Sequence, residues 1–171
     1  MKQATVIFLL LSCALSCVKG NDGEVSHEES SLVKVGDEIP DFTVCNGTDT
    51  LRRGDLAGKK TLLVLFSSTC GDCRLVLPVV EAAWRVLKDD PGVVVAAISR
   101  GETGETVREY WEQSRFSMPW YLDEDRSVFN KFATAYTPRV YLVDGLSRVV
   151  EMHVESLPLS GEELYRKVEA L

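Results

Sequence analysis

The chain has 171 residues, enough for one domain with a full hydrophobic core but too few for two ordinary domains. Hydrophobic residues make up 45% of the chain and charged residues 26%, a composition that is ordinary for a folded protein and argues against global disorder. The formal net charge at pH 7 is -7, so the phosphate backbone of nucleic acids would be repelled. We therefore expect one globular domain that does not bind nucleic acid.

The first 16 residues have the pattern of an export signal. Lys2 precedes an apolar run over residues 6–11, and small residues such as Ser12 and Ser16 follow it. The run is too short for a membrane span, which needs about 20 apolar residues, but it is typical of a signal peptide. We expect residues 1–16 to be a signal peptide that is absent from the folded domain.

Two cysteines lie at the end of this signal, and residues 14–17 resemble the lipobox of bacterial lipoproteins. The resemblance implies that Cys17 becomes the lipidated first residue of the mature chain. Cys13 is the alternative, although processing there would leave an unusually short signal. A simple secretory peptide or an uncleaved anchor is also open.

The residues that follow Cys17 are polar and contain few apolar side chains. Such a segment cannot bury enough surface to offset its loss of conformational entropy. We therefore predict that residues 17–34 form a lipidated, flexible tether and that residues 35–171 form the domain. The protein would then be periplasmic or in the cell envelope, anchored by lipid to a bacterial membrane.

The sequence pattern of the domain predicts an α/β fold. Residues 62–66 and 93–98 are continuous apolar runs, which is how strands buried on both faces of a sheet look. Between them, residues 79–87 carry apolar side chains at helical spacing. A strand, a helix and a second strand in this order predict a right-handed parallel crossover.

Further elements complete this α/β pattern. The sequence predicts helices over residues 105–116, 125–132 and 160–171, strands over 120–122, 140–143 and 149–154, and an early strand or hairpin over 42–51. Asp144-Gly145 is a turn signal, so the last two strands are expected to form an antiparallel hairpin. We predict three layers, with a mixed central sheet flanked by helices and an N-terminal strand or hairpin extension.

The motif with the strongest chemical meaning is Cys70-Gly71-Asp72-Cys73, placed directly after a buried strand and at the expected start of a helix. Unpaired amides and the helix dipole favour negative charge there, so Cys70 is expected to ionise more easily than a free thiol. One helical turn brings Cys73 back beside Cys70, where it can resolve a mixed disulfide. The pattern predicts an attacking thiolate and a resolving partner.

Three other interpretations of the cysteine pair compete with redox chemistry. Zinc requires about four ligands, but the chain has no second CxxC and only two histidines, His27 and His153, both far away in sequence. Arg74 stands where c-type haem attachment requires histidine. A purely structural disulfide stays open, although it is rare in this position. We expect neither a metal nor another cofactor.

A second motif, Thr137-Pro138, immediately precedes a predicted strand. Together with Cys70 and Cys73 it resembles the thioredoxin superfamily, whose cis-proline loop lies against the active cysteines. The resemblance implies a thioredoxin-like fold and a cis bond before Pro138. It also implies that the main chain of Thr137 pairs with a substrate peptide, while Pro138 excludes metal from the dithiol.

Within the superfamily, the chain is most similar to the TlpA- and ResA-like group and the wider AhpC/TSA-related sequences. The similarity rests on Cys73-Arg74 followed by Pro78, on Asp41-Phe42 and on residues 56–59. It implies a thiol-disulfide oxidoreductase that reduces or exchanges disulfides of exported proteins, including apocytochromes before haem attachment. A membrane thiol reductant would supply electrons, and we expect the enzyme to be a monomer.

The chain departs from this family pattern near the cysteines. Thr69 replaces a common tryptophan, Val64 replaces a buried aspartate, and Val76 replaces a glutamate. We therefore expect Thr69, Gly71 and Asp72 to tune the pair, with Asp72 or water accepting protons. A carboxylate beside a thiolate opposes its ionisation, so Asp72 should keep the pair on the reducing side.

Two other functions remain as alternatives. In a peroxiredoxin-like peroxidase the active cysteine follows a Pro-xxx-Thr-xx pattern, but Leu63 and Ser67 fill those places. A lipoprotein binding module could instead keep the fold without turnover. Cys45, a third thiol of the domain, is predicted to be a small buried hydrophobe.

Overall fold

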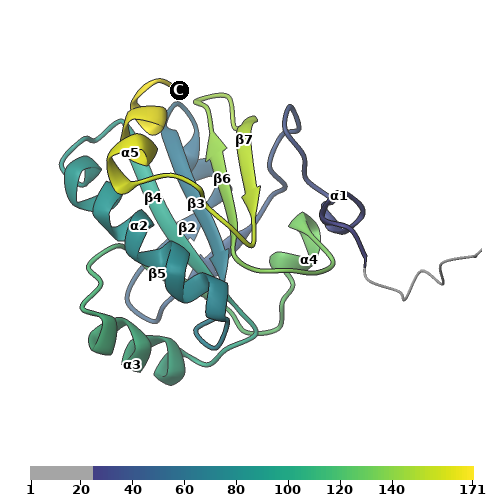
Figure 1. Cartoon of the computed structure of the whole chain (residues 1–171), viewed down its shortest axis with the longest axis vertical. Helices are drawn as coiled ribbons and strands as arrows, with labels where there is room; N and C mark the ends of the chain where they lie inside the picture. The colour runs from purple at the N-terminus through teal and green to yellow at the C-terminus, as the bar shows by residue number, and fades with distance from the viewer. Residues whose placement is uncertain (1–24) are drawn as a thin grey trace, which may run out of the picture.

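The computed structural model describes residues 25–171, so the expected signal peptide, Cys13 and Cys17 lie outside the described residues. The described chain forms one mixed seven-stranded sheet with helices against both faces (Figure 1). This arrangement confirms the predicted thioredoxin-like α/β fold with three layers.

The elements follow one another as strand, helix and strand through the middle of the chain. In order they are α1 (His27–Ser30), β1 (Thr43–Cys45), β2 (Thr50–Arg52), the 3-10 helix η1 (Arg53–Leu56), β3 (Lys60–Phe66), α2 (Gly71–Leu87), β4 (Val93–Arg100), α3 (Gly104–Ser114), β5 (Trp120–Asp123), α4 (Phe129–Phe132), β6 (Arg139–Val143), β7 (Val149–Val154) and α5 (Gly161–Glu169). The order of strands across the sheet is β2-β1-β5-β4-β3-β6-β7. Strands β3, β4 and β5 are parallel to one another, and the remaining neighbours are antiparallel.

Strand β3 is an interior strand of the sheet, because β4 and β6 pair with its two sides. Its side chains alternate between two hydrophobic clusters, so Leu63 and Leu65 face one layer while Leu62 and Phe66 face the other. The second cluster includes buried side chains of α2, α3 and α5. Burial on both faces explains why β3 reads as a continuous apolar run rather than an alternating one.

The crossover from β3 through α2 to β4 positions the cysteine motif. The β3 strand ends at Phe66. Four residues later, Cys70 is the N-cap of α2, whose first helical residue is Gly71. The carboxyl ends of β3, β4 and β5 lie at one edge of the sheet, because these strands are parallel. This edge is where ligand and active sites collect in open α/β sheets.

The N-terminal hairpin appears as predicted, but Cys45 is exposed rather than buried as expected. Strands β1 and β2 pair antiparallel at one edge of the sheet. Side chains of a strand alternate between faces, and Val44 takes the buried position. Cys45 is therefore exposed, and the prediction that it is a buried hydrophobe is wrong.

The segment before the domain differs from the predicted flexible tether. Ser26 and Glu29 form a capping box that starts the short helix α1. The amides of Leu32 and Val33 donate to the Phe132 carbonyl, and the side chain of Val33 is buried. The expectation of a flexible tether over residues 17–34 is therefore wrong from Ser26 onward, because capping and packing hold this part against the domain.

Glu81 is a buried carboxylate that joins α2 to the loop before β5. Its oxygens accept hydrogen bonds from the Ser117 amide and hydroxyl, the Met118 amide and the Arg85 guanidinium. Burial acts to raise the pKa of the Glu81 carboxyl, but these hydrogen bonds outweigh burial and hold the pKa below its usual value. The ionised form therefore stabilises the folded state.

We predict that Glu81→Gln lowers the free energy of unfolding at pH 7 by about 1–3 kcal/mol, because a charged acceptor of several hydrogen bonds is lost. The pKa of Glu81 is lower in the folded than in the unfolded state. Its stabilisation is therefore present above the unfolded value of about 4.3 and is lost as the pH falls through the folded value. Urea unfolding of the wild type and of Glu81→Gln should show this difference in the free energy of unfolding at pH 7 and a smaller difference below about pH 4.

The control for this comparison is Glu109→Gln, which changes an exposed glutamate on α3. That variant should unfold like the wild type at both pH values. An equal loss of stability for Glu81→Gln at pH 7 and at low pH would contradict the role given to its charge.

Candidate redox site

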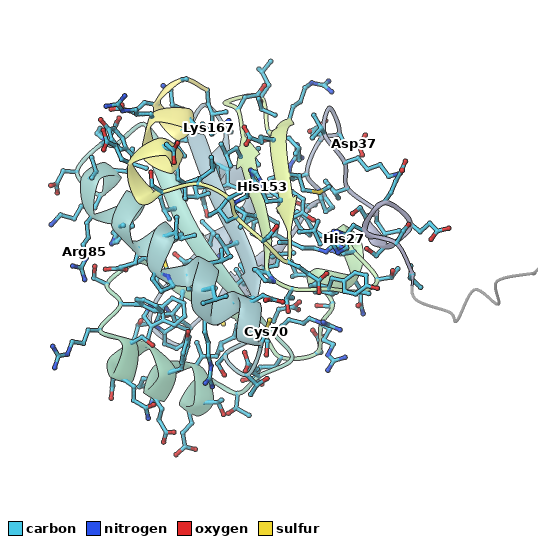
Figure 2. The ribbon with its side chains drawn as sticks, in the orientation of Figure 1. His27, Asp37, Cys70, Arg85, His153 and Lys167 are labelled. Atoms are coloured by element: carbon cyan, nitrogen blue, oxygen red, sulfur yellow. The ribbon has the colours of Figure 1, made fainter. Side chains whose placement is uncertain are left out.

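The cysteine motif lies at the junction between strand β3 and helix α2. Figure 2 shows Cys70 at the end of α2 that adjoins the edge of the sheet. The loop between β3 and α2 is closed by a hydrogen bond from the Cys70 amide to the Ser67 carbonyl, at 3.2 Å. The structure therefore places the motif at the strand-to-helix junction that the sequence predicts.

Cys70 and Cys73 are both free thiols, and their sulfurs lie within one helical turn. The Cys73 amide donates to the Cys70 sulfur at 3.3 Å. Cys70 is half-buried, whereas Cys73 is fully buried, with a relative exposure of 0%. An incoming disulfide can therefore reach Cys70 but not Cys73.

The burial of Cys73 sets the order in which the two sulfurs react. Burial is the largest effect and raises the pKa of the Cys73 thiol to about 12. A hydrogen bond from the Ser67 amide to the Cys73 sulfur, at 3.4 Å, opposes this effect, while the neighbouring Cys70 adds to it. Cys73 consequently stays a thiol at neutral pH, which suits a resolving cysteine rather than an attacking one.

The Thr137–Pro138 peptide bond is cis, as the superfamily resemblance implies. The Cys70 thiol donates to the Thr137 carbonyl, with 3.2 Å between sulfur and oxygen. On the other side of the loop, the Glu155 amide donates to the Pro138 carbonyl at 2.8 Å. The structure thus brings Cys70 and Cys73 together with Thr137 and Pro138, although the two pairs are more than 60 residues apart in the sequence.

The three residues expected to tune the pair are all exposed. Thr69 lies within hydrogen-bond distance of Ser67, with 3.0 Å between their hydroxyl oxygens. Gly71 and Asp72 occupy the first turn of α2. Asp72 is the acidic residue of that turn.

The two positions at which the family resemblance would lead us to expect a carboxylate are apolar and buried. Val64 in β3 and Val76 in α2 both belong to the cluster beneath the cysteines. Neither can accept a proton. The proton of Cys73 must therefore leave by another route, through solvent or through a carboxylate at another position.

One anchor of the active-site loop was missed in the sequence. The Glu102 carboxylate accepts a hydrogen bond from the Ser68 amide at 2.9 Å and another from the Ser68 hydroxyl at 2.5 Å. From α2, the Arg74 guanidinium donates to the Ser68 carbonyl at 3.2 Å. Glu102 follows the end of β4, the parallel neighbour of β3, and this adjacency is the signal that could have revealed it.

A second anchor, Arg139, was also missed. It directly follows Pro138 and is fully buried, so it interrupts an otherwise apolar strand. Its guanidinium donates to the carbonyls of Ala135 and Tyr136, immediately before the Thr137–Pro138 bond. A charged residue at the start of a buried strand is the sequence signal for such a role.

The two histidines are not part of the cysteine site. His27 pairs with Glu155 and His153 with Glu151, and Figure 2 shows both rings apart from Cys70. Within residues 25–171, no cluster of three or more His, Cys, Asp or Glu side chains could hold a metal ion.

We predict that an alkylating reagent at pH 8 modifies Cys70 and the exposed Cys45 in the reduced, folded chain but spares Cys73. With a pKa of about 12, only about one Cys73 in 10,000 is a thiolate at pH 8. Burial also blocks access to its sulfur. Peptide mapping by mass spectrometry gives the extent of modification of each cysteine.

The control is the same reaction in denaturant, where Cys45, Cys70 and Cys73 should react alike. The structure indicates that the two sulfurs differ in access and ionisation. Modification of Cys73 in the folded chain as fast as Cys70 would contradict that difference.

Comparison with known proteins identifies the family. The model of the Redoxin family matches residues 34–166. The thiol-disulfide oxidoreductase ResA of Bacillus subtilis is 26% identical over 150 residues, which cover 86% of this chain and 81% of ResA. The thioredoxin-like protein YneN of the same organism is 23% identical over 141 residues, with 80% of each chain covered.

Solved structures share the fold. A solution structure from Bacteroides thetaiotaomicron, described as a candidate protein disulfide isomerase, has a TM-score of 0.74 and 27% identity, and covers 82% of this chain and 89% of that one. A crystal structure of a candidate thiol:disulfide interchange protein DsbE from Chlorobium tepidum has a TM-score of 0.71 at 22% identity, with coverages of 81% and 97%. The chain therefore belongs to the Redoxin family and is a ResA-like thiol-disulfide oxidoreductase of the thioredoxin superfamily.

Proposed function

We propose that this oxidoreductase works outside the cytoplasm and reduces or exchanges disulfides of exported proteins through a Cys70/Cys73 dithiol-disulfide cycle. The observation that carries the proposal is the unequal burial of two adjacent sulfurs. Cys70 is reachable and lies at a helix N-terminus, whereas Cys73 is buried directly behind it. This is the arrangement that a two-step exchange requires.

In the first step, the Cys70 thiolate attacks one sulfur of the partner disulfide. A bond forms between Cys70 and that sulfur, the partner disulfide bond breaks, and the second partner sulfur leaves as a thiolate that takes up a proton. The Cys73 amide, 3.3 Å from the Cys70 sulfur, stabilises the attacking charge. The main chain of Thr137, adjacent to that sulfur, pairs with the extended partner chain.

In the second step, Cys73 gives up its proton and attacks the Cys70 sulfur. The mixed disulfide breaks, the enzyme disulfide forms, and the first partner sulfur leaves as a thiolate that takes up a proton from solvent. Water or the exposed Asp72 accepts the proton, since the nearby positions Val64 and Val76 are apolar. Two electrons have passed to the partner, so a thiol reductant, which we place in the membrane, must restore the dithiol.

The proposed location rests on the N-terminal sequence. Residues 1–16 have the pattern of a signal peptide, and Cys17 is the proposed site of lipid attachment. In the part of the chain that the structure covers, no helix is long and apolar enough to cross a membrane. A lipid at Cys17 would hold the enzyme beside membrane-bound partners.

We predict that Cys17→Ala, expressed in a bacterial host, loses an incorporated lipid label and leaves the membrane fraction, because the acyl chains that hold it are absent. Metabolic labelling with an alkyne fatty acid and fractionation measure both effects. Cys13→Ala is the matched control and should keep label and location. The reverse result, with loss only in Cys13→Ala, would place the lipid on Cys13.

We predict that Cys70→Ser reduces insulin disulfides only at the uncatalysed rate, because the attacking sulfur is gone. Cys73→Ser should still attack but accumulate mixed disulfides with partner proteins, because resolution is blocked. Turbidity of reduced insulin measures the first effect. Mass spectrometry of proteins captured covalently by Cys73→Ser in its native envelope measures the second and identifies the partners.

Cys45→Ser serves as the control for both variants, since Cys45 is exposed on β1. It should reduce insulin like the wild type. Undiminished insulin reduction by Cys70→Ser would show that the proposed nucleophile is wrong. Rapid thiol-dependent consumption of hydrogen peroxide without insulin reduction would instead indicate a peroxidase, and partner binding that survives loss of the dithiol would indicate a binding module.

A further inference from the structure

The segment just before the domain, which we define as the N-terminal arm over residues 25–31, makes its contacts next to the redox site. The Tyr136 hydroxyl donates to the Val25 carbonyl at 2.5 Å. The His27 ring meets the Tyr136 ring edge-on, with centroids 5.2 Å apart. Helix α1 of the arm lies beside α4 and the loop that leads into β6 (Figure 1).

Arg139 joins the arm to the cis-proline loop. Its guanidinium donates to the hydroxyls of Ser30 and Ser31 in the arm, at 2.7 and 2.8 Å. The same group donates to the carbonyls of Ala135 and Tyr136. Because Arg139 is fully buried, these bonds hold only while the arm stays docked.

The arm reaches the redox site from a second direction through His27. The His27 ring nitrogen lies 2.5 Å from the Glu155 carboxylate. The Glu155 amide donates to the Pro138 carbonyl, and the Thr137 carbonyl accepts the Cys70 thiol. The arm therefore contacts Tyr136, which precedes Thr137, and Glu155, which is hydrogen-bonded to Pro138.

Between the arm and the loop lies an open hollow of about 300 Å³, lined by Val25, Ser26, His27 and Tyr136. Tyr136 lines the hollow and directly precedes Thr137, so the hollow adjoins the loop that carries the proposed binding position for a partner main chain. Its lining combines an apolar side chain with two rings. Such a surface suits side chains of a polypeptide rather than a small disulfide.

From these contacts with the loop around Thr137 and Pro138 we infer that the N-terminal arm forms one wall of the binding surface for polypeptide partners. This inference rests on the proposed function, because it assigns a substrate class to the same redox site. The enzyme would then favour disulfides within an extended polypeptide, whose side chains contact the arm, over small disulfides that reach only Cys70. The arm lies before residue 34, where the match to the Redoxin family begins.

The experiment compares two oxidants of the reduced, full-length chain in single turnover. One is insulin, a polypeptide disulfide, and the other is bis(2-hydroxyethyl) disulfide, which is too small to reach the arm. The rate of enzyme oxidation at increasing oxidant concentration gives a second-order rate constant for each. Their ratio, insulin over small disulfide, is the selectivity.

Two variants change the arm in different ways. Ser30→Ala combined with Ser31→Ala removes the hydroxyls that accept from Arg139 and loosens the whole arm. Val25→Asp keeps the main-chain bond to Tyr136 but places a charge in the hollow. The matched controls are Ser160→Ala, at the N-cap of α5, and Val86→Asp, an exposed position near the far end of α2.

We expect selectivity to fall by about fivefold or more in both arm variants and to stay within about twofold of wild type in both controls. The inference is overturned if either arm variant keeps wild-type selectivity, or if the two rate constants fall together. Wild-type enzyme that neither oxidant oxidises would contradict the proposed function itself. That failure is distinct from a loss of selectivity.

Discussion

The hydrogen bond from the Cys73 amide to the Cys70 sulfur is the contact on which the site depends. The first amides of a helix have no partner within the helix, and here a cysteine sulfur takes the place of the usual oxygen cap. This requires α2 to begin directly at the motif, and the buried strand β3 makes it do so by ending at the edge of the sheet. The sheet thus determines where the sulfur lies, and the helix determines which charge is favoured there.

The second feature of the site is the contrast between its two sulfurs. Cys70 is half-buried, while Cys73 belongs to the same hydrophobic cluster as Val64 and Val76. The apolar surroundings raise the pKa of Cys73, and the two valines among them offer no carboxylate to accept its proton. Protection of the resolving thiol and the lack of a proton acceptor at Val64 and Val76 are therefore two consequences of one packing arrangement. Glu102, which binds the loop through Ser68, stabilises the position of the motif without being part of that cluster.

Sequence patterns predicted the parts of the fold that depend on burial over several residues. The apolar runs of β3 and β4, the helical spacing of α2 and the CxxC motif between them all appear in the structure at the expected places. The cis bond at Pro138 followed from family resemblance rather than from the residues alone. Cys45 was misjudged because a strand of three residues gives too short an alternation to tell the inner face from the outer. The packing of residues 26–34 was missed because their partners, including Phe132 and Arg139, are about 100 residues away in the chain.

The order of the N-terminal arm is a consequence of satisfying one buried cation. Helix α1 has four residues, and isolated helices shorter than about 12 residues are marginal in water, so α1 does not hold the arm in place by itself. Arg139 is fully buried and, within residues 25–171, the oxygens that accept hydrogen bonds from its guanidinium are neutral, two of them from Ser30 and Ser31. Leaving such donors without acceptors costs about 1–3 kcal/mol each, which strongly favours the docked arm. Because the same guanidinium holds Ala135 and Tyr136, the energy that docks the arm also orders the loop facing Cys70.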